Sequence, residues 1–205
     1  MSTGRFVSLE GIDGSGKSTQ ARMLAAALRR MGTTVIETRE PGGTVLGEAV
    51  RGLLLDSPKG SVAPAAEIHL FAASRAQHVA QVIRPALAKG TWVVSDRFVD
   101  SSLAYQGAAR GFGIETVLEA NRTAVDGCLP DLTLVIDVQA ATAAWRRSGN
   151  GDDRIEAEGV RFQELAADGY RELARRFPER VVLIDGAPEA EAVHAAVMTR
   201  ILGLS

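Results

Sequence analysis

The chain has 205 residues, with 23 Lys and Arg against 25 Asp and Glu, so its formal charge of −2 argues against a polycationic surface for nucleic acid or an anionic membrane. The length suits one domain, residues 1–205, and the single cysteine, Cys128, excludes an intramolecular disulfide and a cysteine-built metal site. No apolar run approaches the roughly 20 residues that span a bilayer, and residues 1–5 carry no secretory signal, so we expect a cytoplasmic protein.

Short apolar, β-branched runs alternate along the chain with segments of helical period. The predicted strands are residues 6–9, 34–38, 92–95, 132–137 and 181–184, and the predicted helices are residues 17–31, 67–89, 114–125, 140–147, 160–176 and 188–202. Most strands are almost continuously apolar, as in a sheet covered on both faces. The alternation predicts a three-layer α/β/α fold with five parallel strands, whose ligands bind beyond the carboxyl ends of the strands.

A phosphate-binding pattern, G-x-x-x-x-G-K-S/T, follows the first predicted strand. It comprises Gly11, Ile12, Asp13, Gly14, Ser15, Gly16, Lys17 and Ser18, with Thr19 next. Lys17 would reach the β- and γ-phosphates of ATP, and the hydroxyl of Ser18 would hold Mg²⁺. The alternative is a glycine-rich turn with an incidental lysine. The pattern predicts a P-loop NTPase fold and ATP binding, but it does not identify the reaction.

Further along the chain, other features favour a small-molecule kinase. A guanine-reading N-K-x-D segment is absent, and a motor ATPase needs a longer chain. A kinase needs a second anion site, and the predicted second and third strands lead into Arg39 and Arg97, which could bind an acceptor phosphate. Each arginine could instead pair with its neighbour, Glu40 or Asp96. Asp96 is also a candidate to organise Mg²⁺, through water.

The segment 148–153 is polar and glycine-rich, which predicts a short mobile lid over approximately residues 146–157. Arg146, Arg147 and Arg154 flank it. A lid arginine would neutralise charge on the transferred group. The alternative for each is an ordinary solvated charge, and we favour Arg154 for the catalytic role.

Two other groups of residues could recognise a base. Phe71 and Arg75 lie four residues apart on one helix face, although Phe71 could belong to the core and Arg75 to the surface. Ser102, Tyr105 and Gln106 could read a nucleoside or could simply end a helix. The residues alone therefore predict an ATP-dependent kinase for a small phosphorylated acceptor, with the base undetermined.

Taken together, several segments resemble bacterial thymidylate kinases. They are residues 9–19, 38–44, 71–78, 96–98 with 100–107, 130–133 and 153–156, in the order found in that family. The resemblance implies that thymidine 5′-monophosphate (dTMP) is phosphorylated to the diphosphate. The alternatives are a kinase for another nucleoside monophosphate and a non-catalytic nucleotide-binding regulatory module.

The resemblance also implies roles for individual residues. Phe71 would stack on thymine, and Arg75 and Gln106 would face the base. Tyr105 would crowd the 2′ position of the sugar, and Asp13 would accept a hydrogen bond from the 3′-hydroxyl. Arg39 and Arg97 would hold the acceptor phosphate.

The remaining implications concern the lid, the backbone and assembly. Residues 13–15 include no basic residue, so the chain resembles the family members that carry the catalytic arginine in the lid, which supports Arg154. The family usually has a cis peptide bond before Pro41 and forms a homodimer through helices. Phe98 departs from the family pattern, which has Tyr or His at this position.

Overall fold

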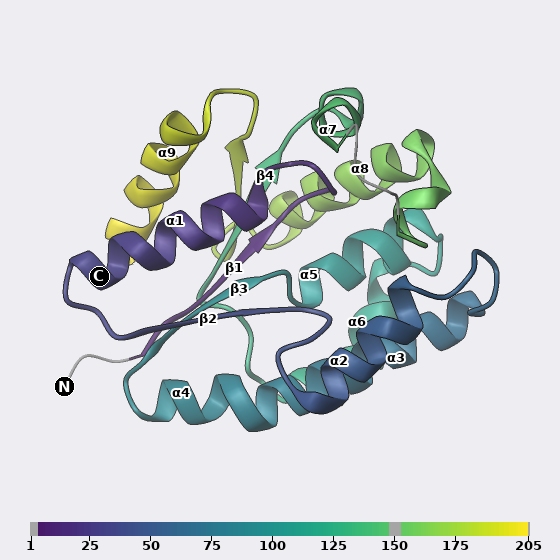
Figure 1. Ribbon diagram of the computed structural model, residues 1–205, viewed down its shortest axis with the longest axis horizontal. Coiled ribbons are helices and arrows are strands. Elements are labelled where there is room, and N and C mark those ends of the chain that lie inside the picture. The colour runs from purple at the N-terminus through teal and green to yellow at the C-terminus, as the bar shows by residue number, and fades with distance from the viewer. Residues whose placement is uncertain (1–3, 148–152, 205) are drawn as a thin grey trace.

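Five parallel strands form one sheet in the computed structural model, which describes residues 4–147 and 153–204 (Figure 1). Their order is β2–β3–β1–β4–β5. The strands are β1 (Phe6–Glu10), β2 (Val35–Arg39), β3 (Trp92–Asp96), β4 (Leu132–Asp137) and β5 (Val181–Asp185). The predicted five-stranded parallel α/β fold is confirmed, and four strands extend one residue further than predicted at their carboxyl ends.

The burial of each strand follows its place in the sheet. Every residue of the central strand β1 is buried, because β3 and β4 flank it and helices cover both faces. The edge strands β2 and β5 mix buried and exposed residues. Within the buried strands, the hydroxyls of Ser8 and Thr133 pair with each other in a 3.0 Å hydrogen bond. The continuous apolar pattern is therefore a property of the central strands.

Helices cover the sheet on both faces (Figure 1). On one face, α1 (Lys17–Arg30) and α9 (Ala190–Leu202) pack through Leu24, Leu28 and Val197 against β-strand residues such as Leu134. The hydrophobic core on the other face includes residues of α3 (Pro64–His78), η1 (Val79–Ile83), α4 (Arg84–Ala88), η2 (Leu103–Ala109), α6 (Ile114–Val125) and α8 (Val160–Arg176). The site described below lies at the carboxyl ends of β1 and β3.

Several helical elements differ from the prediction. The predicted helix 67–89 is three consecutive elements, since a π-helical segment, η1, separates α3 from α4. Two regions, α2 (Val45–Leu55) and α5 (Val99–Ser102) with the π-helical η2, were not predicted as helices. α2 begins at a Thr44 cap, whose hydroxyl accepts a 2.9 Å hydrogen bond from the amide of Gly47. Between α7 (Ala140–Arg147) and α8 lies the 3-10 turn η3 (Glu156–Glu158).

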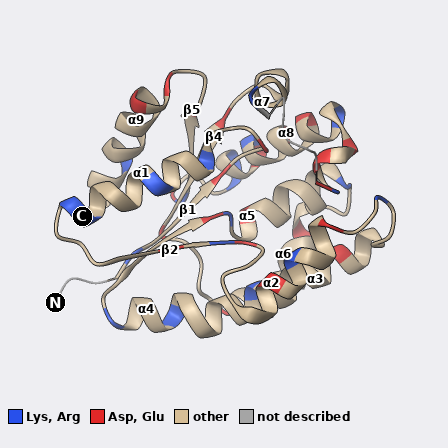
Figure 2. Cartoon of the chain, viewed as in Figure 1, with Lys and Arg blue, Asp and Glu red and all other residues tan. Residues whose placement is uncertain are grey.

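Two further expectations can be compared with the described residues. The Glu40–Pro41 peptide bond is cis, which confirms the expectation taken from the family resemblance. Within residues 4–147 and 153–204, no helix is both long enough and apolar enough to cross a membrane. In the view of Figure 2, acidic and basic residues are interspersed.

Candidate active site

The P-loop occupies the turn between β1 and α1, and its glycines give it the shape that phosphate binding needs. Gly11 has a φ of 134°, and a Cβ there would lie 2.6 Å from the carbonyl oxygen of Ile136. Gly16, with a φ of 98°, is the N-cap of α1, and Lys17 is the first residue of that helix. The loop therefore presents the amino end of α1 at the carboxyl end of β1, an arrangement that favours anions.

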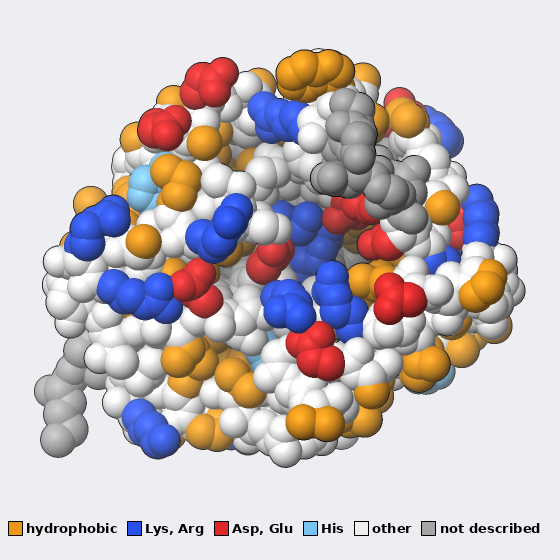
Figure 3. All heavy atoms as spheres, viewed as in Figure 1, with side chains coloured by type: hydrophobic (Ala, Val, Ile, Leu, Met, Phe, Trp, Pro, Cys, Tyr) orange, Lys and Arg blue, Asp and Glu red, His pale blue; other side chains and the backbone are white. Residues whose placement is uncertain are grey.

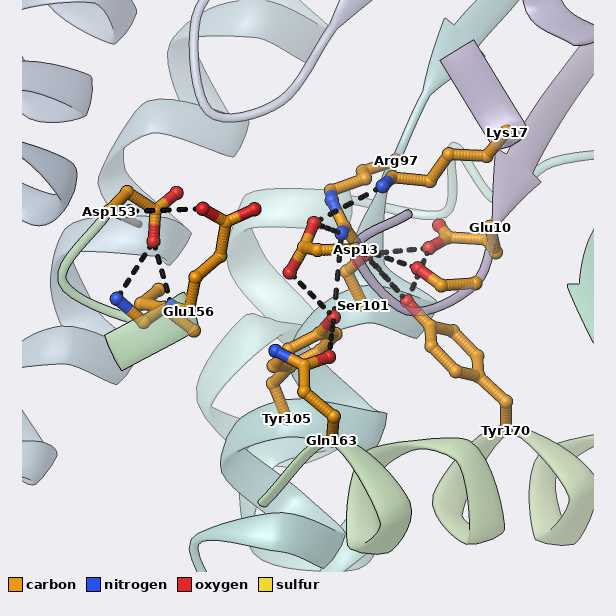
Figure 4. A network of polar contacts seen from close by, with 12 residues as sticks. Glu10, Asp13, Lys17, Arg97, Ser101, Tyr105, Asp153, Glu156, Gln163 and Tyr170 are labelled. Carbon is orange, nitrogen blue, oxygen red and sulfur yellow. Dashed lines mark hydrogen bonds and ion pairs between the residues drawn. The ribbon is translucent and has the colours of Figure 1, made fainter. Parts of the chain in front are cut away.

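Asp13 joins the P-loop to the end of β3 (Figure 4). One carboxylate oxygen accepts hydrogen bonds from Lys17 Nζ, at 3.2 Å, and from Arg97 Nη2. The other accepts from the Tyr105 hydroxyl at 3.0 Å. Burial alone would raise the pKa of Asp13, but the charges of Arg97 and Lys17 lower it far below its ordinary value. One ionised carboxylate thus links Lys17, Arg97 and the η2 segment.

Arg97 follows β3 with an unusual backbone conformation and several side-chain contacts. Its φ is 75°, in a region that non-glycine residues seldom occupy. Nη1 donates to the carbonyl of Gly11 at 3.1 Å and to the hydroxyls of Ser101 and Tyr170 at 2.9 and 3.2 Å. Its ion pair is with Asp13 and not with the neighbouring Asp96, so the alternative of a neighbouring salt bridge is wrong for Arg97.

A hollow beside Asp13, the acceptor hollow, brings together most of the residues that are predicted to bind the phosphate acceptor. Its lining includes Asp13, Phe71, Arg97, Ser102, Tyr105 and Gln106. Phe71 also packs against the main hydrophobic core, so it belongs both to the core and to the hollow. In the space-filling view, Lys and Arg side chains surround a hollow at the centre of the face, with Asp and Glu beside them (Figure 3). The chemistry of this lining suits an anionic ligand with an aromatic part.

Arg75 lies in the interior rather than on the surface, with only 1% of its area exposed. It donates to Glu40 at 2.9 Å, to Asn121, and at 3.2 Å to both the Phe98 carbonyl and the Ser102 hydroxyl. Arg75 is not among the described residues that line the hollow, although it supports two that are, Glu40 and Ser102. The interpretation of Arg75 as a surface charge is therefore wrong.

Phe98, the departure from the family pattern, is completely buried. Its ring meets the ring of Phe6 edge to face, with the centroids 4.9 Å apart. The guanidinium carbon of Arg75 lies 5.4 Å from the Phe98 ring centroid. An apolar ring suits this site, since it fills core volume between Phe6 and a buried cation.

Arg39 lies apart from the hollow that Arg97 lines. It is half exposed and donates to both carboxylate oxygens of Glu48, at 2.9 and 3.0 Å, rather than pairing with Glu40. Arg39 instead lines a second hollow together with Ser18 and Asp96. The structure therefore separates the two predicted phosphate-binding arginines.

This second hollow contains the two predicted Mg²⁺ residues. Asp96 Oδ1 is buried and has no hydrogen-bond partner among the residues that the structure describes. The Ser18 side chain is exposed beside it. Within the same described residues, no group of three or more His, Cys, Asp and Glu could hold a metal. A carboxylate and a hydroxyl fit Mg²⁺, which is typically held by one or two carboxylates, water and substrate phosphates.

The lid region is described only on either side of residues 148–152, which lie outside the described residues, as does the side chain of Arg147. Asp153 and Glu156 cap each other: Asp153 Oδ1 accepts from the Glu156 amide at 2.9 Å, and Glu156 Oε2 accepts from the Asp153 amide at 3.0 Å (Figure 4). Between them, Ile155 lines the acceptor hollow. This reciprocal cap explains the spacing of Asp and Glu in the D-R-I-E sequence.

Arg154, the predicted lid arginine, is 5% exposed, and its side chain is held by other parts of the protein. It donates to Glu67 Oε2 and to the carbonyl of Leu54, both at 2.6 Å. Arg146 instead contacts the P-loop, donating to the carbonyls of Gly186 at 3.0 Å and Ser15 at 3.4 Å. The structure therefore does not bring Arg154 together with Lys17 in the conformation described.

Sequence reasoning missed several residues at the site. Arg51 of α2 lines the acceptor hollow and donates to the carbonyl of Pro41 at 3.0 Å. Glu67 is completely buried and also accepts hydrogen bonds from Gln106, at 2.8 Å, and from Arg110. Thr44 is a typical N-cap residue, so it could have indicated the helix that carries Arg51. The partners of Glu67 are too distant in sequence to be recognised by spacing.

A third hollow also includes residues of the P-loop in its lining. Its lining includes Ser15, Gly16, Thr19, Trp145 and Arg146. None of the described residues that line it also lines the acceptor hollow.

Comparisons with known proteins agree over nearly the whole chain. The family model for thymidylate kinase matches residues 9–197. The thymidylate kinase of Caldanaerobacter subterraneus is 47% identical over 195 residues, which cover 95% of this chain and 93% of that protein. The thymidylate kinase of Pelotomaculum thermopropionicum is 49% identical over 197 residues, covering 95% and 91%. The crystal structure of thymidylate kinase from Ehrlichia chaffeensis matches with a TM-score of 0.77 and 33% identity, covering 97% of this chain and 98% of that one. The chain therefore belongs to the thymidylate kinase family.

Proposed function

We propose a residue-level assignment for the reaction that membership of this family implies, the ATP-dependent phosphorylation of dTMP to dTDP. The observation that carries it is the shared carboxylate of Asp13, which contacts both Lys17 and Arg97. A donor phosphate on Lys17 and an acceptor phosphate on Arg97 would therefore be neighbours. Proximity of this kind supplies much of the catalysis in phosphoryl transfer.

For the acceptor, we propose that dTMP occupies the hollow beside Asp13. Phe71 would stack on thymine, and Tyr105 and Gln106 would contact the nucleoside. Gln106 is supported by its 2.8 Å bond to Glu67, which fixes its amide group. The direct bond from Arg75 to the base stays a prediction, because its guanidinium already makes four hydrogen bonds within the protein.

For the acceptor phosphate, we propose Arg97 together with Arg51, since both line this hollow. Arg39 stays a candidate that would have to turn away from Glu48 to reach the same phosphate. Asp13 would accept a hydrogen bond from the 3′-hydroxyl. Ser102, held by Arg75, would complete the polar wall.

For ATP, we propose that residues Gly11 to Thr19 hold the phosphates and that the hollow containing Trp145 receives the adenosine end. Ser18 and Asp96 would hold Mg²⁺, with Asp96 acting directly or through water. When bound, the ion would neutralise phosphate charge.

The transfer itself would proceed in line from ATP to the dTMP phosphate oxygen. No general base is required, since a phosphate monoester is already largely ionised near pH 7. Lys17 would hold the transferring group in place. As a lid arginine we keep Arg154, with Arg146 and Arg147 as further candidates. Arg154 would have to leave Glu67, whereas Arg146 already touches the P-loop, and single alanine variants separate the two.

We also propose a homodimer and a cytoplasmic location, where ATP is available. The dimer is supported by exposed apolar side chains on α2, where Val45 is 92% exposed and Leu46 and Leu53 are about half exposed. Sedimentation at micromolar concentration tests it: a monomeric protein contradicts the proposal.

The reaction is tested by ADP release from Mg·ATP with each common nucleoside monophosphate and with thymidine, side by side. We expect dTMP to give the highest turnover. Faster turnover with another monophosphate would assign the hollow to a different acceptor. ADP release at background with every acceptor would leave a nucleotide-binding regulatory module as the better interpretation.

A further inference from the structure

Behind Arg97 lies a group of three side chains to which the proposed reaction gives no role: Glu10, Ser101 and Tyr170 (Figure 4). We propose that they form a positioning cluster that sets the direction of the Arg97 guanidinium and thereby the affinity for the acceptor phosphate. This inference rests on the proposed role of Arg97 in binding that phosphate.

The first support is the direction of the hydrogen bonds. The hydroxyls of Ser101 and Tyr170 both donate to Glu10 Oε2, at 2.6 and 2.9 Å. The two hydroxyl oxygens also lie 2.9 Å apart, but a carboxylate is the stronger acceptor. A hydroxyl has one proton to give. Because the ionised carboxylate of Glu10 accepts a hydrogen bond from each hydroxyl, the oxygen lone pairs of Ser101 and Tyr170 remain available to Arg97.

Arg97 uses these lone pairs. Its Nη1 lies 2.9 Å from the Ser101 oxygen and 3.2 Å from the Tyr170 oxygen. Its Nη2 binds Asp13, in the P-loop. The guanidinium is thus held on one side by two oriented hydroxyls and on the other by a carboxylate of the active site, which defines the plane in which it can meet a phosphate.

The second support is the backbone of Arg97. A positive φ is costly for a side chain of this kind and persists only where the surroundings enforce it. The amide of Arg97 donates to the Leu9 carbonyl at 2.9 Å, and its carbonyl accepts from Ser95 Oγ at 2.7 Å. The next amide, of Phe98, donates to Glu10 Oε1 at 2.7 Å. Glu10 therefore supports both the backbone turn and the side chain.

The third support is the burial and origin of the cluster. Glu10, at the end of β1, is 0% exposed, and Tyr170, in α8, is 1% exposed. Neither is among the described residues lining the acceptor hollow, so both would act through Arg97. Ser101, in α5, does line it. A structural element that packs against the sheet, α8, thus reaches the acceptor site through the Tyr170 hydroxyl.

The test is equilibrium binding of dTMP and of thymidine, without ATP and at about pH 8, where Glu10 is ionised, to the full chain carrying Tyr170→Phe, Arg97→Ala or both. Tyr170→Phe removes the hydrogen bond that Arg97 donates to the Tyr170 hydroxyl, so the guanidinium is less well oriented toward the phosphate. We expect dTMP binding to weaken about tenfold. Thymidine, which has no phosphate, should bind as before. In the Arg97→Ala background, Tyr170→Phe should add nothing, because the two changes act on one interaction.

Two further variants complete the experiment. Ser101→Ala should weaken dTMP binding in the same direction as Tyr170→Phe. Ser74→Ala removes a buried hydroxyl that has no hydrogen-bond partner among the described residues, and it should leave dTMP binding unchanged. These substitutions delete only a hydroxyl, so the protein is expected to remain folded.

The outcomes separate the inference from the proposed function. If Arg97→Ala leaves dTMP affinity unchanged, the proposed role of Arg97 is wrong, and so is the proposed role of the positioning cluster. If Arg97→Ala weakens dTMP binding but Tyr170→Phe does not, the cluster alone is wrong. Equal weakening of dTMP and thymidine, or the same effect of Tyr170→Phe with and without Arg97, would also overturn it.

Discussion

Arg154 donates a 2.6 Å hydrogen bond to Glu67, and both side chains are almost completely buried. The sequence predicts Arg154 in the lid, where it would neutralise charge on the transferred group, whereas in the structure it ties the lid region to α3. Glu67 has further partners in Arg110 and Gln106. Arg154 is therefore linked through Glu67 to Gln106, which lines the acceptor hollow.

The first prediction concerns stability. Arg154→Ala should lower the free energy of unfolding by on the order of 3 kcal/mol, because it removes a cation from a buried carboxylate. Urea denaturation measures the change. Arg161→Ala, which removes an exposed arginine of α8, should leave stability almost unchanged and is the matched control. Similar stability in both variants would contradict the structural role of Arg154.

The second prediction concerns turnover. At a temperature where Arg154→Ala stays folded, we expect kcat to fall far more than dTMP affinity, because the proposed role has the side chain leave Glu67 for the transferring group. Arg146→Ala measured alongside shows which arginine serves the transfer. Unchanged kcat in folded Arg154→Ala would remove it from the transfer step.

The third prediction concerns the base. Phe71→Ala should weaken dTMP binding by about 1–3 kcal/mol, the contribution of one base stacked on an aromatic ring, without changing ATP affinity. Calorimetry with each nucleotide measures both. Phe177→Ala is the control, since Phe177 also packs against the main core but does not line the described hollow. An unaltered dTMP Kd in Phe71→Ala would leave Phe71 with a packing role alone.

The fourth prediction concerns pH. Burial and the nearby charge of Asp100 raise the pKa of Glu10 to about 7, against the opposing effects of Ser101, Arg97 and the Phe98 amide. A folded-state pKa above the unfolded value of 4.5 means that the folded protein holds this proton more tightly, so Glu10 lowers stability as the pH rises through this window.

Urea denaturation of the unmodified protein and of Glu10→Gln at about pH 5 and about pH 8 checks this sign. The unmodified protein should lose stability relative to the variant at the higher pH, because glutamine does not ionise. A difference between the two proteins that does not change with pH would exclude Glu10 as the titrating group.

The fifth prediction concerns Mg²⁺. Chelation should abolish dTDP formation while leaving dTMP binding intact. Asp96→Asn should raise the Mg²⁺ concentration needed for half-maximal turnover, whereas Asp168→Asn, at an exposed position in α8, should not. The same Mg²⁺ dependence in Asp96→Asn as in the unmodified protein would remove Asp96 from the metal site.

The parts of the structure that could be predicted from sequence are those encoded locally. The P-loop is contiguous, and the central strands carry apolar runs that reflect burial on both faces. α2 was missed because it exposes Val45, Leu46 and Leu53 while burying Val50 and Leu54, which obscures the helical period. The π-helical segments η1 and η2 do not follow the 3.6-residue period at all.

The site could be predicted only as a set of residue types. Contacts such as Arg97 with Tyr170, 73 residues apart, and Arg154 with Glu67, 87 residues apart, depend on how the elements pack. Spacing does not encode them. For the same reason the sequence could not show that Arg75 is committed to buried partners or that Arg39 lies beside Glu48.

The most direct test of the proposed reaction is dTDP formation from dTMP and Mg·ATP by the unmodified protein and by Lys17→Ala, followed by ³¹P NMR. The proposed assignment predicts steady dTDP formation by the unmodified protein. It predicts a loss of at least about a hundredfold in kcat for Lys17→Ala, with dTMP affinity almost unchanged, because Lys17 stabilises charge on the transferring group. Equal rates in both proteins, or no dTDP from the unmodified protein, would contradict it.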